Sequence, residues 1–123
     1  MEFIHTEKAP VPAGHYSQAV ISGGMLYVSG QLPINPTDRS VPTGIGEQAS
    51  QVLDNLEQIL LAGGSSLQKV VKVTVYISDI SLWGAFNQVY AGKFGSHRPA
   101  RAVVPTRELH HDFLVEVEAV AEL

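Results

Sequence analysis

An arginine lies inside a short apolar run near the C-terminal end of the chain, Pro99-Ala100-Arg101-Ala102-Val103-Val104. Pro99 can open a β-strand but cannot occupy its centre, and side chains alternate between the two faces of a strand. Arg101 and Val103 are therefore expected on one face. A guanidinium on a largely apolar strand is costly to bury unless an anion meets it. That anion is either a carboxylate of the protein or a carboxylate of a ligand.

Two glutamates on the last predicted strand are the carboxylates of the protein that can meet Arg101. Glu116 and Glu118 are separated by one residue, so they share one face of that strand. From the residues alone, a structural ion pair of Arg101 with Glu116 or Glu118 is favoured over a ligand site. The alternative is that Arg101 holds a ligand and that a glutamate acts as an acid or base.

Four further candidate positions have ordinary structural explanations when each is taken singly. Tyr16 fits a half-buried core residue, Ser29-Gly30 a strand end, and Asn87 the flank of a helix. The pair His110-His111 invites a metal interpretation, but neighbouring strand residues point to opposite faces and cannot readily chelate one ion. A polar hairpin tip is the better interpretation of that pair, and no metal site is predicted.

Composition narrows the class of protein. The chain has 123 residues, 45% of them hydrophobic, and no cysteine, which predicts a single domain over 1–123 without disulfides or a thiolate nucleophile. A protein without cysteine fits a reducing cytoplasm, where we expect this one to act. The first eight residues hold no apolar signal-peptide core, and no apolar run reaches the roughly 20 residues that span a bilayer. The net charge of −4 argues against a broad nucleic-acid-binding surface.

Hydrophobic periodicity predicts the elements that must position these side chains. Gly23-Gly24 is expected to form the turn of a hairpin, and Gly63-Gly64 to end the first helix. Gln48 is expected to face away from the apolar stripe of that helix, and Ser81 to cap the second helix. The predicted elements are an edge strand at 3–6, hairpin strands at 16–22 and 25–29, a helix at 47–62, a strand at 69–77, a helix after 81 that ends at 95–98, a strand from 99, and a strand at 113–121 after a hairpin near 110–112.

This order of elements predicts an α+β domain with a mixed sheet. Two helices can cover only one face of the sheet. Val70, Val103, Leu114 and Val120 are expected to place apolar side chains on the other face. Nothing remains in the chain to cover that face, so self-association is the simplest explanation.

The candidate residues together resemble the Rid family of reactive-intermediate imine deaminases, which also carries older endoribonuclease and translation-inhibitor labels. The resemblance extends over essentially the whole chain. The motifs that carry it are Tyr16, Ser29-Gly30-Gln31, Asn87-Gln88-Val89-Tyr90, Pro99-Ala100-Arg101 and Glu116-Val117-Glu118. It implies a chorismate-mutase-like fold and a homotrimer whose sheets pack around a central barrel. It also implies three ligand clefts between subunits.

The resemblance implies hydrolysis of enamines or imines, such as 2-aminoacrylate and its imine tautomer, to 2-keto acids and ammonia, without a cofactor. Arg101 matches the arginine that holds the substrate carboxylate, and Tyr16, Ser29, Gly30, Asn87 and Glu116 match other cleft positions. Two positions depart from the family pattern. Val103 stands where active members commonly have a cysteine, although its backbone N–H can still donate. His110 stands where many members have a proline.

The implied chemistry is plausible on physical grounds. The arginine fork fits a carboxylate bidentately and fixes the substrate beside a water molecule. Glu116 can activate that water or carry a proton to the leaving amine. A trimer that binds a small carboxylate without turnover is the alternative function. A ribonuclease is a weaker one, because no basic patch and no evident acid–base pair of histidines is present.

Overall fold

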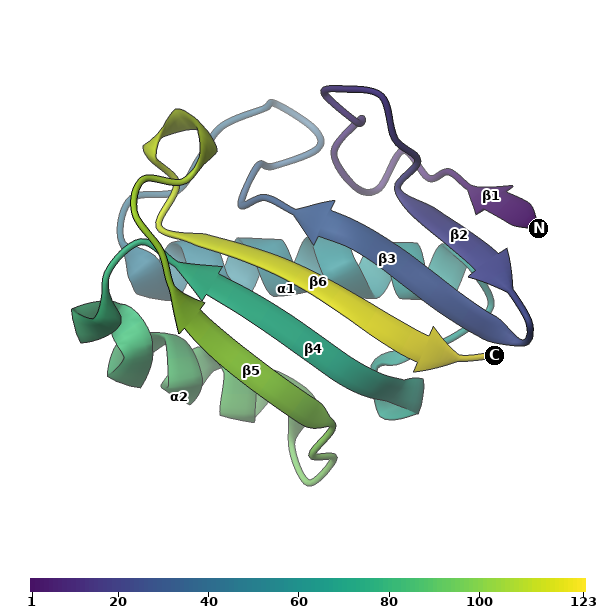
Figure 1. Ribbon diagram of the computed structural model, residues 1–123. Helices are drawn as coiled ribbons and strands as arrows, with labels where there is room; N and C mark the ends of the chain where they lie inside the picture. Colours follow the sequence, from purple (N-terminus) through teal and green to yellow (C-terminus); the bar gives the residue numbers. More distant parts are fainter.

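The computed structural model describes residues 1–123 as one six-stranded mixed sheet with two helices behind it (Figure 1). The sheet order is β1-β2-β3-β6-β4-β5, and only the pair β4–β5 is parallel. Short 3-10 turns lie at Leu67–Lys69, Ile80–Leu82 and His110–Asp112. The elements are β1 (Glu2–Ile4), β2 (Ala19–Ser22), β3 (Met25–Gln31), α1 (Ile45–Ala62), β4 (Val70–Ile77), α2 (Trp83–Phe94), β5 (Ala100–Pro105) and β6 (Val115–Glu122).

The predicted α+β class with both helices on one face is confirmed, and one apolar core lies between helices and sheet. The apolar stripe of α1 is fully buried, and alternate residues of β6 from Val115 to Ala121 are buried as well. Gln48 was expected to face solvent, and that expectation is wrong. Its side chain is buried, donates to Pro42 O at 3.0 Å and accepts from Leu114 N at 2.9 Å. A buried amide with both ends satisfied ties α1 to the loop before it and to the start of β6.

The β2–β3 hairpin is confirmed, with Gly23 and Gly24 both at positive φ in its turn. Its first strand begins at Ala19 rather than at Tyr16. The second predicted hairpin, near His110–Asp112, is wrong. β6 does not pair with β5 but inserts between β3 and β4, antiparallel to both. The chain therefore crosses β4 on its way from the edge strand to the centre of the sheet (Figure 1).

A β-bulge at the start of β4 changes which side chains face the core. Val70 pairs with Ala121 and Lys72 with Val120, so Val71 is the extra residue. Val70 is buried in the core and Val71 is exposed, which is the reverse of the predicted alternation. Val103 also lies on the helix side, because it pairs with buried Val75. Both valines were expected on the open face, and for both that prediction is wrong.

The entry to α2 also differs from the prediction. Asp79, not Ser81, is the capping residue: its carboxylate accepts from the backbone N–H of Ser81 at 2.8 Å, at the head of a 3-10 turn.

Farther along α2, Lys93 forms ion pairs with Asp54 and Glu57 of α1, at 2.7 and 3.0 Å. These are the only ion pairs in the chain. Neither helix is both long and apolar enough to cross a membrane.

The sheet face opposite the helices is rich in apolar side chains. Val120 lies on this face as predicted, and Leu114, just before β6, is half-buried. Strand register assigns four further apolar side chains to the same face: Phe3, Val20, Tyr27 and Val104. Phe3 is 68% exposed and Tyr27 48% exposed, so no part of the chain covers this face. We refer to it below as the open face.

Candidate functional site

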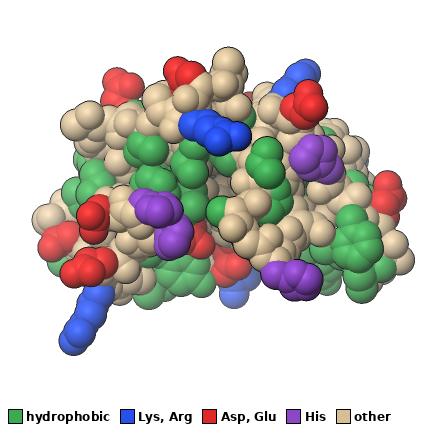
Figure 2. Space-filling view, turned by 90° about the horizontal axis from the view of Figure 1, so that it is seen from above, with side chains coloured by type: hydrophobic (Ala, Val, Ile, Leu, Met, Phe, Trp, Pro, Cys, Tyr) green, Lys and Arg blue, Asp and Glu red, His purple; other side chains and the backbone are tan.

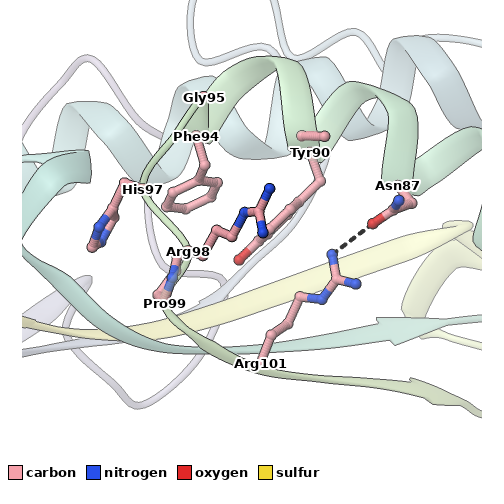
Figure 3. A pocket seen from close by; sticks show the side chains of 9 residues that line it. Asn87, Tyr90, Phe94, Gly95, His97, Arg98, Pro99 and Arg101 are labelled. Carbon is pink, nitrogen blue, oxygen red and sulfur yellow. Dashed lines mark hydrogen bonds between the residues drawn. The ribbon is translucent and has the colours of Figure 1, made fainter.

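Arg101 lies on the helix side of β5, facing α2. It pairs in register with Val73, a fully buried residue of β4. Its Nη1 donates to Asn87 Oδ1 at 2.9 Å (Figure 3). Its Cζ lies 4.6 Å from the ring centroid of Tyr90 and 5.8 Å from that of Trp83. The amide and the two rings fix the plane and direction of the guanidinium without neutralising its charge.

The helix supplies these three partners through its own periodicity. Trp83, Asn87 and Tyr90 follow an i, i+4, i+7 spacing, which places them on one face of α2. The sequence singled out Asn87 but not the two aromatic residues. The spacing is visible in the sequence, yet only the packing of α2 against β5 shows that this face meets Arg101.

No carboxylate of the chain pairs with Arg101, because the only ion pairs are those of Lys93. A structural ion pair of Arg101 with Glu116 or Glu118 was favoured from the residues alone, and within the chain that prediction is wrong. Arg101 and Asn87 instead line a cavity of about 320 Å³ between α2 and the start of β5 (Figure 3).

A second cavity, of about 390 Å³, gathers four of the other candidate residues. It is lined by Tyr16, Ser29, Gly30 and Glu116, together with His110. A bulge in β3 at Ser29-Gly30 shapes it, since the register with β6 shifts between Val28 and Gln31. Bulges of this kind often re-aim side chains beside functional sites. A Cβ on Gly30 would overlap the carboxylate of Glu116, which therefore lies directly against this glycine.

The two glutamates of β6 differ in their environment. Glu118 accepts a hydrogen bond from Tyr76 Oη at 3.0 Å, and this bond raises the pKa of Tyr76. Glu116 has no ion-pair partner, and burial raises its pKa above the ordinary value. The charge of Glu118 acts in the same direction, and His110 opposes it. Glu116 is thus the less stabilised carboxylate, and such a group accepts a proton more readily.

Buried amides that the sequence did not reveal hold the loops around this second cavity. Gln18 donates to Thr6 O and Pro10 O at 3.0 and 2.9 Å, which folds the N-terminal loop back toward β2. Asn55 of α1 donates to Leu32 O and Ile34 O, both at 2.9 Å, and fixes the chain after β3. Hydrophobic periodicity carries no signal for buried amides.

Within these loops, the two hydroxyl-bearing candidates are held by the backbone. Tyr16 Oη accepts from Ala13 N at 3.2 Å, within the loop that Gln18 anchors. Ser29 Oγ donates to Ser17 O at 2.6 Å. Both side chains are therefore placed at the rim of the cavity before any ligand enters.

The two cavities lie on opposite sides of the sheet. Arg101 is in register with Val73 on the helix side, whereas Glu116 is in register with Tyr76 on the open face. The candidate residues thus fall into two groups: Arg101 and Asn87 in one, and Tyr16, Ser29, Gly30 and Glu116 in the other. Val103 lines neither cavity and packs against the core on the Arg101 side.

His110 and His111 lie in a 3-10 turn, with ring centroids 3.9 Å apart. His111 has a φ of 55°, which turns the chain sharply at this point. His110 faces the Glu116 cavity, whereas His111 lines a separate groove beside Arg39 and Phe113. No cluster of three or more His, Asp or Glu side chains suited to a metal ion is present.

Comparison with known proteins gives a consistent picture. Residues 6–123 match the family model described as endoribonuclease L-PSP. The chain is 46% identical over 121 residues to a RutC family protein of Pyrococcus horikoshii, covering 98% of this chain and 96% of that protein. It is 42% identical over 119 residues to the 2-iminobutanoate/2-iminopropanoate deaminase of Rattus norvegicus, covering 96% and 87% of the two chains.

Solved structures agree in fold over the full length. RidA from an Antarctic Psychrobacter species superposes with a TM-score of 0.97 at 37% identity, and the whole of both chains is covered. Escherichia coli TdcF with bound serine superposes with a TM-score of 0.96 at 34% identity, covering 100% of this chain and 99% of that one.

Proposed function

Because this chain belongs to the Rid family, whose model is described as endoribonuclease L-PSP, we propose that it hydrolyses reactive 2-imino acids and their enamine tautomers. The products are a 2-keto acid and ammonia. The deaminase named in Rattus norvegicus, 42% identical, supports this reaction class. The bound serine of the Escherichia coli relative supports a ligand with a carboxylate beside a nitrogen-bearing carbon.

One observation carries the proposal: the chain presents a guanidinium and a carboxylate, each without an ion-pair partner and each lining a cavity. Arg101 is oriented by Asn87 and Tyr90 but has no anionic partner. Glu116 lies against Gly30 and has no cationic partner. Charged groups that line a cavity and have no partner suit a ligand that completes the charge balance.

In the proposed reaction Arg101 binds the substrate carboxylate bidentately, and Asn87 keeps the guanidinium in plane. Backbone N–H groups near Gly30 and Val103 hydrogen-bond the substrate, and Tyr16 and Ser29 close the side of the cleft. Fixing the carboxylate holds the neighbouring C=N carbon beside a water molecule, so orientation accounts for much of the rate enhancement.

Glu116 moves the protons. It takes a proton from the water as oxygen attacks the protonated imine carbon, which forms a tetrahedral amino alcohol. It then returns that proton to the amine nitrogen. As the C–N bond breaks, Glu116 passes the hydroxyl proton of the intermediate to the departing ammonia, which leaves a 2-keto acid and ammonium. The raised pKa of Glu116 favours both steps, since proton exchange is most efficient when the catalyst pKa lies closer to the working pH.

The two half-sites lie on opposite faces of one sheet, so we propose that the complete cleft forms between subunits. In a homotrimer built on the open face, the Arg101 group of one subunit meets the Glu116 group of the next. The apolar open face supports such an assembly, since exposed apolar patches mark interfaces. A cyclic trimer has three identical heterologous interfaces and therefore three clefts.

The assay that tests the proposal measures ammonia and keto-acid release from freshly generated 2-aminoacrylate, with the spontaneous hydrolysis rate subtracted. A pyridoxal-phosphate dehydratase acting on serine supplies the enamine. We expect the protein to accelerate release, and the Arg101→Ala variant to leave only the spontaneous rate. A wild-type protein that leaves the spontaneous rate unchanged, over several imines, rules out the deaminase.

A second candidate is a trimer that binds a small carboxylate without turnover, which the serine bound to the Escherichia coli relative favours. Calorimetry that detects keto-acid binding, with no acceleration in the release assay, would establish it. The ribonuclease label has less support. The net charge is −4, and Lys and Arg side chains are scattered over the face shown in Figure 2 rather than gathered into a patch.

A further inference from the structure

The cavity beside Arg101 contains a buried hydroxyl that nothing in the chain satisfies. Tyr90 Oη is the only buried side-chain polar atom without a hydrogen-bond partner, and Tyr90 is 6% exposed. Burial raises the pKa of Tyr90 to about 12, so the hydroxyl keeps its proton and is available as a donor. An unsatisfied buried donor is costly, and this one borders a cavity of about 320 Å³.

The same cavity has a second guanidinium. Arg98 lines it one residue before Pro99, and Figure 3 shows the Arg98 side chain extending toward Tyr90 and Phe94. Arg98 takes part in no ion pair. No Asp or Glu lines the cavity, so both of its arginines are uncompensated by the chain. The cavity therefore favours an anion beyond the single carboxylate assigned to Arg101.

The other polar side chain at this end of the cavity is already engaged. His97 Nε2 lies 2.7 Å from Val70 O, which holds the ring against the start of β4. Phe94 packs on Tyr90 with ring centroids 4.5 Å apart and forms an apolar wall. The exposed Arg98 and the buried Tyr90 hydroxyl are thus the two polar groups there that have no partner in the chain.

We propose that this cavity is a subsite for a second carboxylate, held by Arg98 and the Tyr90 hydroxyl, and that the preferred substrates are 2-imino dicarboxylic acids. This inference rests on the proposed deaminase function, since Arg101 must hold the first carboxylate. Three residues of extended chain span at most about 10 Å. The side chains of Arg98 and Arg101 can therefore converge on the two ends of a five-carbon diacid.

Calorimetry with two stable keto acids that differ only in the terminal group tests the subsite. The probes are 2-oxoglutarate and 2-oxopentanoate, which have the same chain length. Wild-type protein is expected to bind the diacid about tenfold more tightly or better, since a bound carboxylate gains charge-assisted hydrogen bonds. Arg98→Gln is expected to abolish this preference while leaving 2-oxopentanoate binding unchanged. Tyr90→Phe, which keeps the ring against Arg101, is expected to weaken diacid binding to a smaller degree.

Arg107→Gln is the matched control, because Arg107 is exposed and lines neither cavity of the candidate site. It is expected to bind both probes like wild type. Equal binding of the two probes by wild type, or a diacid preference that survives in Arg98→Gln, overturns the subsite.

Turnover separates this inference from the function on which it rests. Rates are measured with 2-iminoglutarate and 2-iminopentanoate, generated by oxidation of the amino acids. Acceleration of both imines with no preference for the diacid contradicts the subsite alone. No acceleration of either imine, with an Arg98-dependent diacid preference in calorimetry, contradicts the deaminase and keeps the anion subsite.

Discussion

Arg101 and Glu116 lie on opposite faces of the same sheet, and neither has an ion-pair partner in the chain. Arg101 faces α2, with its guanidinium 2.9 Å from Asn87 Oδ1, and Glu116 faces the side that no helix covers. In the proposed assembly each residue supplies half of a cleft, and the half that a subunit lacks comes from its neighbour.

Arg101→Ala is expected to remove imine hydrolysis and leave the fold intact. The substitution loses one hydrogen bond and two ring contacts, which together cost about 1.5–3.5 kcal/mol in the free energy of unfolding. Had Arg101 paired with a buried glutamate, the loss would be about 3–5 kcal/mol. Thermal unfolding measured beside the release assay distinguishes the two.

Arg101→Lys keeps the positive charge but not the planar fork, so it is expected to recover little activity. Full activity in Arg101→Ala would show that this arginine does not hold the substrate. A collapse of thermal stability in that variant would show that Arg101 is structural.

Glu116→Gln is expected to be inactive and more stable than wild type at neutral pH. Burial raises the pKa of Glu116 in the folded protein. At pH values between the unfolded and the folded pKa, the folded protein therefore holds a proton that the unfolded chain has released. The favourable contribution of protonated Glu116 is complete below the unfolded pKa and is lost as pH rises through the folded pKa. The advantage of the glutamine variant in melting temperature should therefore be absent at low pH and grow as pH rises. Glu122→Gln, at the exposed end of β6, is the control and should show no such trend.

The activity of the wild-type protein should also depend on the ionisation of Glu116, but it should rise with pH where the contribution of Glu116 to stability falls. Glu116 must be ionised to accept the proton from water, so the rate is expected to rise with pH through its raised pKa. A rate independent of pH across that range, with the spontaneous rate subtracted, would argue against Glu116 as the base.

Periodicity predicted the elements whose burial follows one repeat without interruption. The stripe of α1 and the alternation of β6 are such cases, and their apolar faces are the core. Prediction failed where one residue broke the repeat. The extra residue Val71 reverses the facing of Val70 and Val71 only, whereas Val73, Val75 and Ile77 face the core as the alternation predicts, and no residue type marks the bulge in advance. β6 pairs with β3 and β4, which are distant from it in the sequence. The turn residues near His110 are local and do not indicate which strands β6 will pair with.

The sequence named the candidate site residues but not their arrangement. The resemblance to the Rid family named Arg101, Asn87 and Glu116, and the structure brings Arg101 and Asn87 together. The division of the candidates between two faces depends on strand register. The stacking of Tyr90 and Trp83 on Arg101 depends on how α2 packs on β5. The residue types alone determine neither the strand register nor the packing of α2 on β5.

Val120→Lys is expected to break the assembly, because it places a charge at a position of the open face that the trimer would bury. Light scattering at micromolar concentration should give a trimer for wild type and a mass near 13.3 kDa for the variant. Val41→Lys, at an exposed loop position, is the control and should remain trimeric. A monomeric wild-type protein would exclude the intersubunit cleft.

RNA binding is expected to be weak and to fall steeply as salt is raised, because a chain of net charge −4 offers few phosphate contacts. Filter binding and a nuclease assay at physiological ionic strength check this. Tight binding there, with cleavage that copurifies with the protein and survives in Arg101→Ala, would favour the ribonuclease instead.

Subunit complementation tests the intersubunit site most directly. Arg101→Ala and Glu116→Gln are each inactive in the proposed mechanism, and each keeps the half-site that the other lacks. After joint unfolding and refolding in equal amounts, random cyclic trimers should regain activity at about a quarter of their clefts. Recovery of activity in the mixture, with none in either variant refolded alone, is the predicted result. A mixture that assembles into trimers yet stays as inactive as its parents would contradict a cleft shared between Arg101 of one subunit and Glu116 of the next.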